Sequence, residues 1–165
     1  MNAQEYLTTL KSRLAHYYDE KLVPQAPEFI LAAELNAADE GYFIVPSLKT
    51  YSVQHNEYLY VQSSSTPLTL AQVKPYLEFC QKAMADLKTT TEHMSTIFSL
   101  VFICETGIMA DDLVALQKIK MHKDYCFTLK GWADLALYFV DLSSQTLYYN
   151  KVGSKNTNLF ALPKN

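Results

Sequence analysis

The first helical pattern lies near the start of the chain. Apolar side chains recur three and four positions apart from Tyr6 to Tyr17, which is the spacing of one face of an α-helix. Asn2 and Glu5 have the spacing of a capping box, in which each side chain bonds the other residue's backbone N–H. Pro24 and Pro27 follow, and proline does not continue a helix interior. The pattern predicts an N-terminal helix of about four turns.

Two further helices are indicated in the middle of the chain. Apolar residues step by three and four without a break between residues 70 and 87, and Thr69 with Gln72 forms a second capping pair. Pro75 lies inside this stripe, so it either kinks the first turns or marks the true start of the helix. A third helix is expected from residue 111 to residue 122, because acids near its start and lysines near its end complement the helix dipole.

Most other apolar segments are rich in β-branched and aromatic residues, which favours strands. Residues 93–105 are apolar on both alternating faces after Thr96, so we expect this strand at the centre of the sheet. Residues 54–57 are expected to form a hairpin turn. The predicted strands are 29–35, 42–45, 51–53, 58–61, 93–105, 125–129, 133–142 and 147–150, although residues 31–35 would suit a helix equally well.

This order of elements predicts an α+β fold. A helix precedes the strand at 93–105 and another precedes the strand at 125–129, so parallel pairs can form within a mixed, mostly antiparallel sheet. We expect three helices packed on this sheet. The length of 165 residues fits one domain spanning residues 1–165, with a polar tail at 153–165 that is expected to fray.

Composition and charge narrow the class of protein. Hydrophobic residues make up 49% of the chain and the net charge is −3, which is typical of a folded protein and argues against a general nucleic-acid binder or an anionic-membrane binder. No apolar run suggests a signal peptide or a membrane span. The three cysteines are not at metal spacing and read as reduced thiols. We therefore expect a cytoplasmic protein.

Four segments together resemble a family of small bacterial cytoplasmic proteins of unknown function. The resemblance covers nearly the whole chain and implies a bacterial, cytoplasmic protein. It implies no activity, ligand or catalytic residue. The segments that carry it are Glu92–Ile97, Lys130–Trp132, Val140–Leu142 and Tyr149–Lys151.

Residues that support catalysis do not form a recognised motif. The four histidines fall in four different predicted elements, and none has another His or Cys at ligand spacing, so we expect no metal site. The four glycines are too far apart for a phosphate-binding loop, so we expect no nucleotide cofactor. A nuclease-like metal site is a weaker alternative, since its acid-x-Lys pattern occurs only at predicted helix ends. These patterns lean against an enzyme and predict no cofactor.

The aromatic residues point to an interaction surface. Twelve tyrosines are present, many on predicted strands, and Trp132 follows a glycine at a strand break. Ordinary cross-strand packing also explains such tyrosines. Residues 118–132 combine lysines with aromatic residues, as a surface for single-stranded nucleic acid would. The net negative charge of the chain argues against nucleic-acid binding. The favoured hypothesis is a non-enzymatic domain that binds a protein partner or itself.

The rival hypothesis is an enzyme or a small-ligand binder whose site forms only in three dimensions. Its candidate residues lie near predicted strand ends, where sites of α/β proteins often occur. Together with Trp132 as an interface or pocket-rim residue, the candidates are His93, Glu105, Lys130 and Asp134. The substrate or partner, the order of the strands and the oligomeric state do not follow from the sequence.

Overall fold

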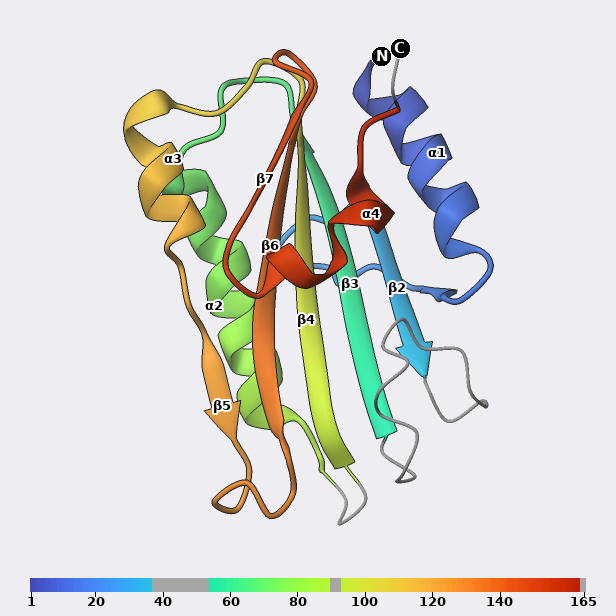
Figure 1. Cartoon of the computed structure of the whole chain (residues 1–165), viewed down its shortest axis with the longest axis vertical. Helices are drawn as coiled ribbons and strands as arrows, with labels where there is room; N and C mark the ends of the chain where they lie inside the picture. Colours follow the sequence, from blue (N-terminus) through green and yellow to red (C-terminus); the bar gives the residue numbers. More distant parts are fainter. Residues whose placement is uncertain (37–53, 90–92, 164–165) are drawn as a thin grey trace.

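The computed structural model describes residues 1–36, 54–89 and 93–163. In these residues a seven-stranded mixed sheet has the order β1-β2-β3-β4-β6-β5, with β7 paired to β6 beyond this path. The helices lie on both faces of the sheet (Figure 1). The strands are β1 Asp19–Lys21, β2 Leu31–Asn36, β3 Gln54–Ser64, β4 His93–Cys104, β5 His122–Asp124, β6 Trp132–Asp141 and β7 Thr146–Tyr149. The helices are α1 Ala3–Leu14, α2 Leu70–Asp86, α3 Ala110–Gln117 and α4 Thr157–Phe160, with the 3-10 helix η1 at Gly153–Asn156.

The centre of the sheet is parallel and its margins are antiparallel. Strands β3, β4 and β6 run parallel, joined by crossovers that contain α2 and α3. The other four pairings are antiparallel. The predicted α+β class is therefore confirmed. The described residues contain four α-helices where three were expected, and the additional one is the short α4.

Two apolar layers hold the helices on the sheet. On one face, α2 and α3 cover Phe98, Leu100 and Phe102 of β4. On the other face, α1 and α4 cover Val101 and Ile103 of the same strand. Because alternate residues of β4 are buried on opposite faces, this strand is central, as its continuous apolar sequence predicts.

Local sequence signals set the starts of α1 and α2. The side chain of Asn2 accepts from the backbone N–H of Glu5, and the side chain of Thr69 accepts from that of Gln72. Both capping boxes are complete, as predicted. Pro75 lies inside α2 rather than at its start.

One asparagine completes the outer edge of β6. Strand β5 pairs with the start of β6, and β7 pairs with its end. Between them, the Asn150 side chain accepts from the N–H groups of Leu137 and Gly153 and donates to the carbonyls of Leu135 and Ile119, at 2.9–3.0 Å. This fully buried side chain therefore replaces a strand partner along the gap.

The segment between α3 and β6 differs from the prediction. The helix expected to reach residue 122 ends at Gln117, and His122 lies in the short strand β5. The strand expected at 125–129 is wrong, because Cys126, Phe127 and Thr128 adopt positive φ angles that no strand permits. Residues 125–129 have a high β-propensity, but the chain reverses here to enter β6, so they form a loop.

Two other segments also differ from the prediction. The turn expected at 54–57 is wrong, because these residues begin β3 and pair with β4. The predicted strands 42–45 and 51–53 lie outside the described residues. The tail expected to fray forms η1 and α4 from Gly153 onwards, because Phe160 is fully buried and its carbonyl accepts from the Tyr6 hydroxyl at 2.8 Å.

Candidate functional site

The candidate residues from the sequence lie at opposite ends of the parallel strands. Lys130, Trp132 and Asp134 lie at or just before the start of β6, and His93 begins the neighbouring strand β4. Glu105 follows the far end of β4, where its Oε1 accepts from the backbone N–H of Ala3 at 3.1 Å. Four of the candidates thus share one end of the sheet, and Glu105 instead holds the start of α1.

A histidine between two aspartates lies at this shared end. Nδ1 of His122 lies 2.7 Å from Oδ1 of Asp134, and its Nε2 lies 3.1 Å from Oδ1 of Asp124. The hydrogen bond to Asp134 is the largest cause of a raised pKa of His122, and the Asp124 carboxylate adds to it. The protonated ring donates to both carboxylates, whereas the neutral ring has one N–H and can donate to only one of them; binding a metal through either nitrogen would require releasing an aspartate.

The sequence did not predict the pairing of His122 with two aspartates, because His122 was expected at the end of a helix. In β5, His122 and Asp124 are two residues apart, so their side chains point to the same face of the sheet. The alternation was present in the sequence, but the pairing of His122 with Asp134 depends on strand register.

A half-buried glutamate lies on the same sheet face as α1. Glu57 on β3 accepts from the Tyr18 hydroxyl at 2.8 Å and from Ser99 Oγ at 2.6 Å, through different oxygens. Burial raises the pKa of Glu57, although both hydrogen bonds oppose this rise. In the strand register, Ile97 of β4 pairs with Glu57 of β3 on one side and with Asp134 of β6 on the other. The carboxyls of Glu57 and Asp134 are therefore separated by an apolar residue.

No metal centre is formed by the residues that the structure describes. Among them, no group of three His, Cys, Asp or Glu side chains is arranged to hold a metal ion. The carboxyl of Glu57 can titrate, but both of its oxygens already accept hydrogen bonds, from Tyr18 and from Ser99.

The tyrosines of β3 are used for packing. The rings of Tyr60 and Phe79 are 5.0 Å apart, and those of Tyr58 and Phe98 are 5.2 Å apart. Helix α2 therefore covers the tyrosine-bearing face of β3 that the sequence suggested as an interaction surface.

Among the described residues, the most exposed aromatic side chain lies instead on residues 125–131, here called the β5–β6 loop. Its base is fixed, since the buried Tyr125 donates its hydroxyl to the carbonyl of Met84 at 2.6 Å. The backbone N–H of Tyr125 donates to the carbonyl of Gly131 at 3.0 Å, and that of Lys130 donates to the carbonyl of Tyr125 at 3.1 Å. The loop is thus a closed, hydrogen-bonded structure at the lower end of the molecule (Figure 1).

The tip of the β5–β6 loop combines unusual backbone with exposed apolar side chains. Cys126, Phe127 and Thr128 have φ angles of 50°, 53° and 70°, which non-glycine residues rarely adopt even singly. Phe127 is 95% exposed and Leu129 is 81% exposed. Both were expected within a strand, so their shared exposure did not follow from the sequence.

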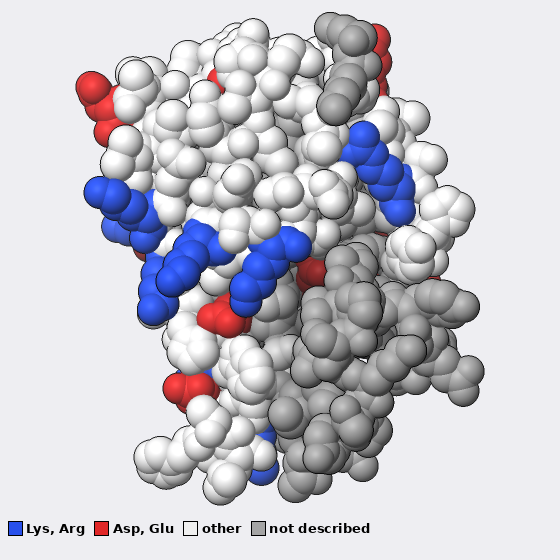
Figure 2. All heavy atoms as spheres, viewed as in Figure 1, with Lys and Arg blue, Asp and Glu red and all other residues white. Residues whose placement is uncertain are grey.

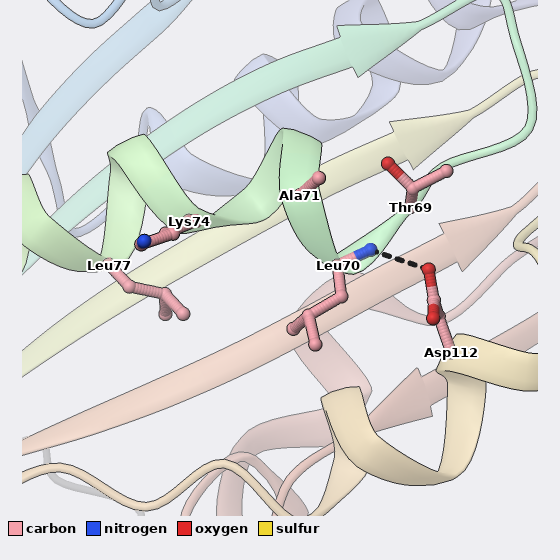
Figure 3. Close-up of a pocket in the computed structure, with 6 residues that line it drawn as sticks. All are labelled: Thr69, Leu70, Ala71, Lys74, Leu77 and Asp112. Carbon is pink, nitrogen blue, oxygen red and sulfur yellow. Dashed lines mark hydrogen bonds between the residues drawn. The ribbon is translucent and has the colours of Figure 1, made fainter.

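A shallow hollow lies where α2 and α3 begin (Figure 3). Leu70 and Leu77 extend from the same side of α2. Oδ2 of Asp112 accepts from the backbone N–H of Leu70 at 2.8 Å, so a carboxylate already occupies the place where an anion would meet the helix N-terminus. The lining residues are Thr69, Leu70, Ala71, Lys74, Leu77 and Asp112.

Comparison with known proteins identifies a family. Residues 2–162 match the family described as a domain of unknown function, DUF8052. The chain belongs to this family. The resemblance to a family of unknown function that covers nearly the whole chain is thus confirmed. No curated protein and no solved structure matches the chain. Membership in DUF8052 assigns no activity, so functional arguments must come from the geometry of the domain.

The charged side chains of this DUF8052 chain bear on the alternative of a nucleic-acid surface. Lys and Arg side chains form a band across part of the face that carries α4 (Figure 2). Within the basic segment at 118–132, the Lys123 ammonium lies 5.7 Å from the ring centroid of Tyr125, which is buried. This ring is therefore not free to stack on a base. None of the helices in the described ranges is long and apolar enough to span a bilayer.

Proposed function

We propose that this DUF8052 chain is a non-enzymatic protein-interaction domain that contacts its partner through the β5–β6 loop. The observation that carries the proposal is the nearly complete exposure of Phe127 and Leu129. Single exposed apolar residues are common on protein surfaces, but two large ones at the tip of one closed loop form a small apolar patch that a partner can contact.

The backbone of the loop supports a binding role. Three successive left-handed residues cost free energy, at about 1 kcal/mol or more each. The internal hydrogen bonds of the loop hold this arrangement and keep the tip ordered. An ordered tip loses less conformational entropy on binding than a mobile one, so more of the apolar burial contributes to affinity.

The shape of the loop favours a protein over a small ligand. Small-molecule sites are usually concave and bury most of the ligand. Phe127 and Leu129 project from a loop, so they are suited to enter a depression on another protein. Burying each of these side chains would contribute about 1.5–3 kcal/mol before the costs of association.

Affinity capture from the source cells tests this function with three baits. These are the native chain, the loop variant Phe127→Ser with Leu129→Ser, and the control Leu22→Ser. Leu22 is 97% exposed beside β1, at the opposite edge of the sheet. A protein captured by the native chain and the control, but lost with the loop variant, is expected. Equal capture by all three baits would contradict a role for the loop.

We also propose that the chain acts as one domain in the bacterial cytoplasm. The free, buried thiols of Cys80 and Cys104 and the net charge of −3 support this placement. Fractionation of source cells that recovers the protein outside the cytosolic fraction would contradict it.

A further inference from the structure

We infer that the β5–β6 loop binds the hollow between α2 and α3 on a second copy of this chain, so that copies associate head to tail. This inference rests on the proposed function, because it names the partner of the loop. The observation behind it is the presence, on one chain, of an exposed apolar tip and an open apolar hollow.

The hollow is chemically suited to apolar side chains. Leu70, Ala71 and Leu77 supply its apolar lining. On the adjacent α3 and the turn before it, Met109 is 43% exposed and Val114 is 57% exposed. Since Asp112 already satisfies the backbone N–H of Leu70, an apolar group can enter without leaving this donor unpaired.

The charges beside the two surfaces are complementary. Lys123 and Lys130 flank the tip of the β5–β6 loop, whereas Asp111 and Asp112 lie in the first turn of α3 beside the hollow. One charge of the opposite sign lies beside each surface, namely Lys74 in the lining of the hollow and Asp124 before the loop. Complementary rims favour the loop-to-hollow pairing over loop-to-loop pairing, which would bring lysines together.

The positions of the two surfaces determine the form of the assembly. The hollow lies at the N-terminal end of α2, and the loop is fixed to Met84 near the C-terminal end of that helix. They therefore lie at opposite ends of the molecule (Figure 1). A contact between two different surfaces leaves one loop and one hollow free in each pair, so further copies can add unless the rotation closes a ring.

The contact is small, so the association is expected to be weak. A patch of a few apolar side chains lies well below the area of a stable interface. We expect a dissociation constant of about 10 µM to 1 mM, so association is measured at high concentration.

Analytical ultracentrifugation of the purified full chain tests the inference with two complementary variants. The loop variant carries Phe127→Ser and Leu129→Ser and keeps an intact hollow. The hollow variant carries Leu70→Lys, which removes an apolar lining residue and places a positive charge opposite the lysines of the loop. Leu22→Ser serves as the control, and thermal melts verify that every variant is folded.

The native chain and Leu22→Ser are expected to increase in average mass with concentration. Each interface variant alone is expected to have a dissociation constant raised about tenfold or more, so that it stays largely monomeric at concentrations where the native chain associates. An equimolar mixture of the two variants is expected to form a dimer that does not grow, because one intact loop meets one intact hollow.

Several results would overturn head-to-tail association. A native chain that stays monomeric up to about 1 mM would exclude a second copy as the partner. Association that persists in the hollow variant, or a mixture that stays monomeric, would exclude the hollow as the binding surface. Binding of the monomer to phosphatidylserine vesicles through Phe127 would assign the loop to a membrane. Capture of a different protein through the loop by a monomeric chain would leave the proposed function intact.

Discussion

Single side chains decide how segments far apart in the sequence meet in this fold. Asn150 joins β6, η1 and the segment before β5 through four hydrogen bonds. Glu57 joins β3 to Tyr18 and Ser99. His122 links β5 to β6 through Asp134. Each contact leads to a prediction about stability or protonation.

Asn150→Ala should lower the free energy of unfolding by about 3 kcal/mol, because it leaves buried backbone groups of Leu135 and Leu137 without their partners. Urea denaturation followed by circular dichroism measures the change. Asn158→Ala, an exposed position on α4, is the matched control and should change stability little. Equal stability of the two variants would contradict a central role for Asn150.

Glu57→Gln should change how stability depends on pH. Burial raises the pKa of Glu57 above its ordinary value of 4.5, so the folded state holds the proton more tightly than the unfolded state. The contribution of this group is therefore present below that value and is lost as the pH rises through the folded pKa. The variant should become more stable relative to the native chain over that range, as urea unfolding at several pH values would measure.

Glu78→Gln is the control for this prediction, because it changes an exposed carboxyl on α2. A stability difference between Glu57→Gln and the native chain that stays constant across this pH range would rule out a raised pKa of Glu57.

His122 should titrate above its ordinary pKa of 6.5, mainly because of its hydrogen bond to Asp134. Its contribution to stability is present below 6.5 and is lost as the pH rises through the raised, folded pKa. In an NMR titration, Asp134→Asn should lower the midpoint of His122, whereas Asp111→Asn on the distant α3 should not. A titration midpoint of His122 that is the same in Asp134→Asn and in the native chain would contradict the contact between His122 and Asp134.

At the scale of elements, patterns carried by neighbouring residues were predictable and those set by distant contacts were not. The capping box of α2 needs only Thr69 and Gln72, so the sequence contained the correct start, although it left a start at Pro75 open as the alternative. The β5–β6 loop has the composition of a strand, yet Tyr125 is fixed to Met84 of α2 and the chain turns back. The partner of His122 likewise depends on strand register, which sequence spacing does not contain.

Replacing Thr128 by glycine tests the strain in the loop. Thr128 has a φ of 70°, which glycine adopts without a steric penalty; because glycine also costs about 0.5–1 kcal/mol of unfolded-state entropy, Thr128→Gly should stabilise the chain by only about 0–1 kcal/mol in urea unfolding. Thr66→Gly is the control in an exposed loop without positive φ, and it should destabilise by about 0.5–1 kcal/mol. Destabilisation by both changes would mean that the left-handed turn is not strained.

At the scale of the whole molecule, the apolar surface is unequally distributed. The sheet faces are covered by helices, including the tyrosines of β3, while Phe127 and Leu129 project together from the β5–β6 loop and Leu22 projects at the opposite edge of the sheet. The exposed side chains of Phe127 and Leu129 still support the hypothesis of an interaction surface, but they lie on the β5–β6 loop and not on the sheet. The sequence did not reveal this location because exposure depends on how the whole fold covers its apolar residues.

Site-specific photo-cross-linking in the source cells shows whether the tip of the β5–β6 loop contacts another protein. Benzoylphenylalanine at position 127 keeps an aromatic ring at the loop tip, and the same group at position 22 probes an equally exposed site at the other edge of the sheet. We expect cross-links to protein from position 127 that are absent from position 22 and are lost with Leu129→Ser. No cross-link from position 127, or equal yields from both positions, would contradict it.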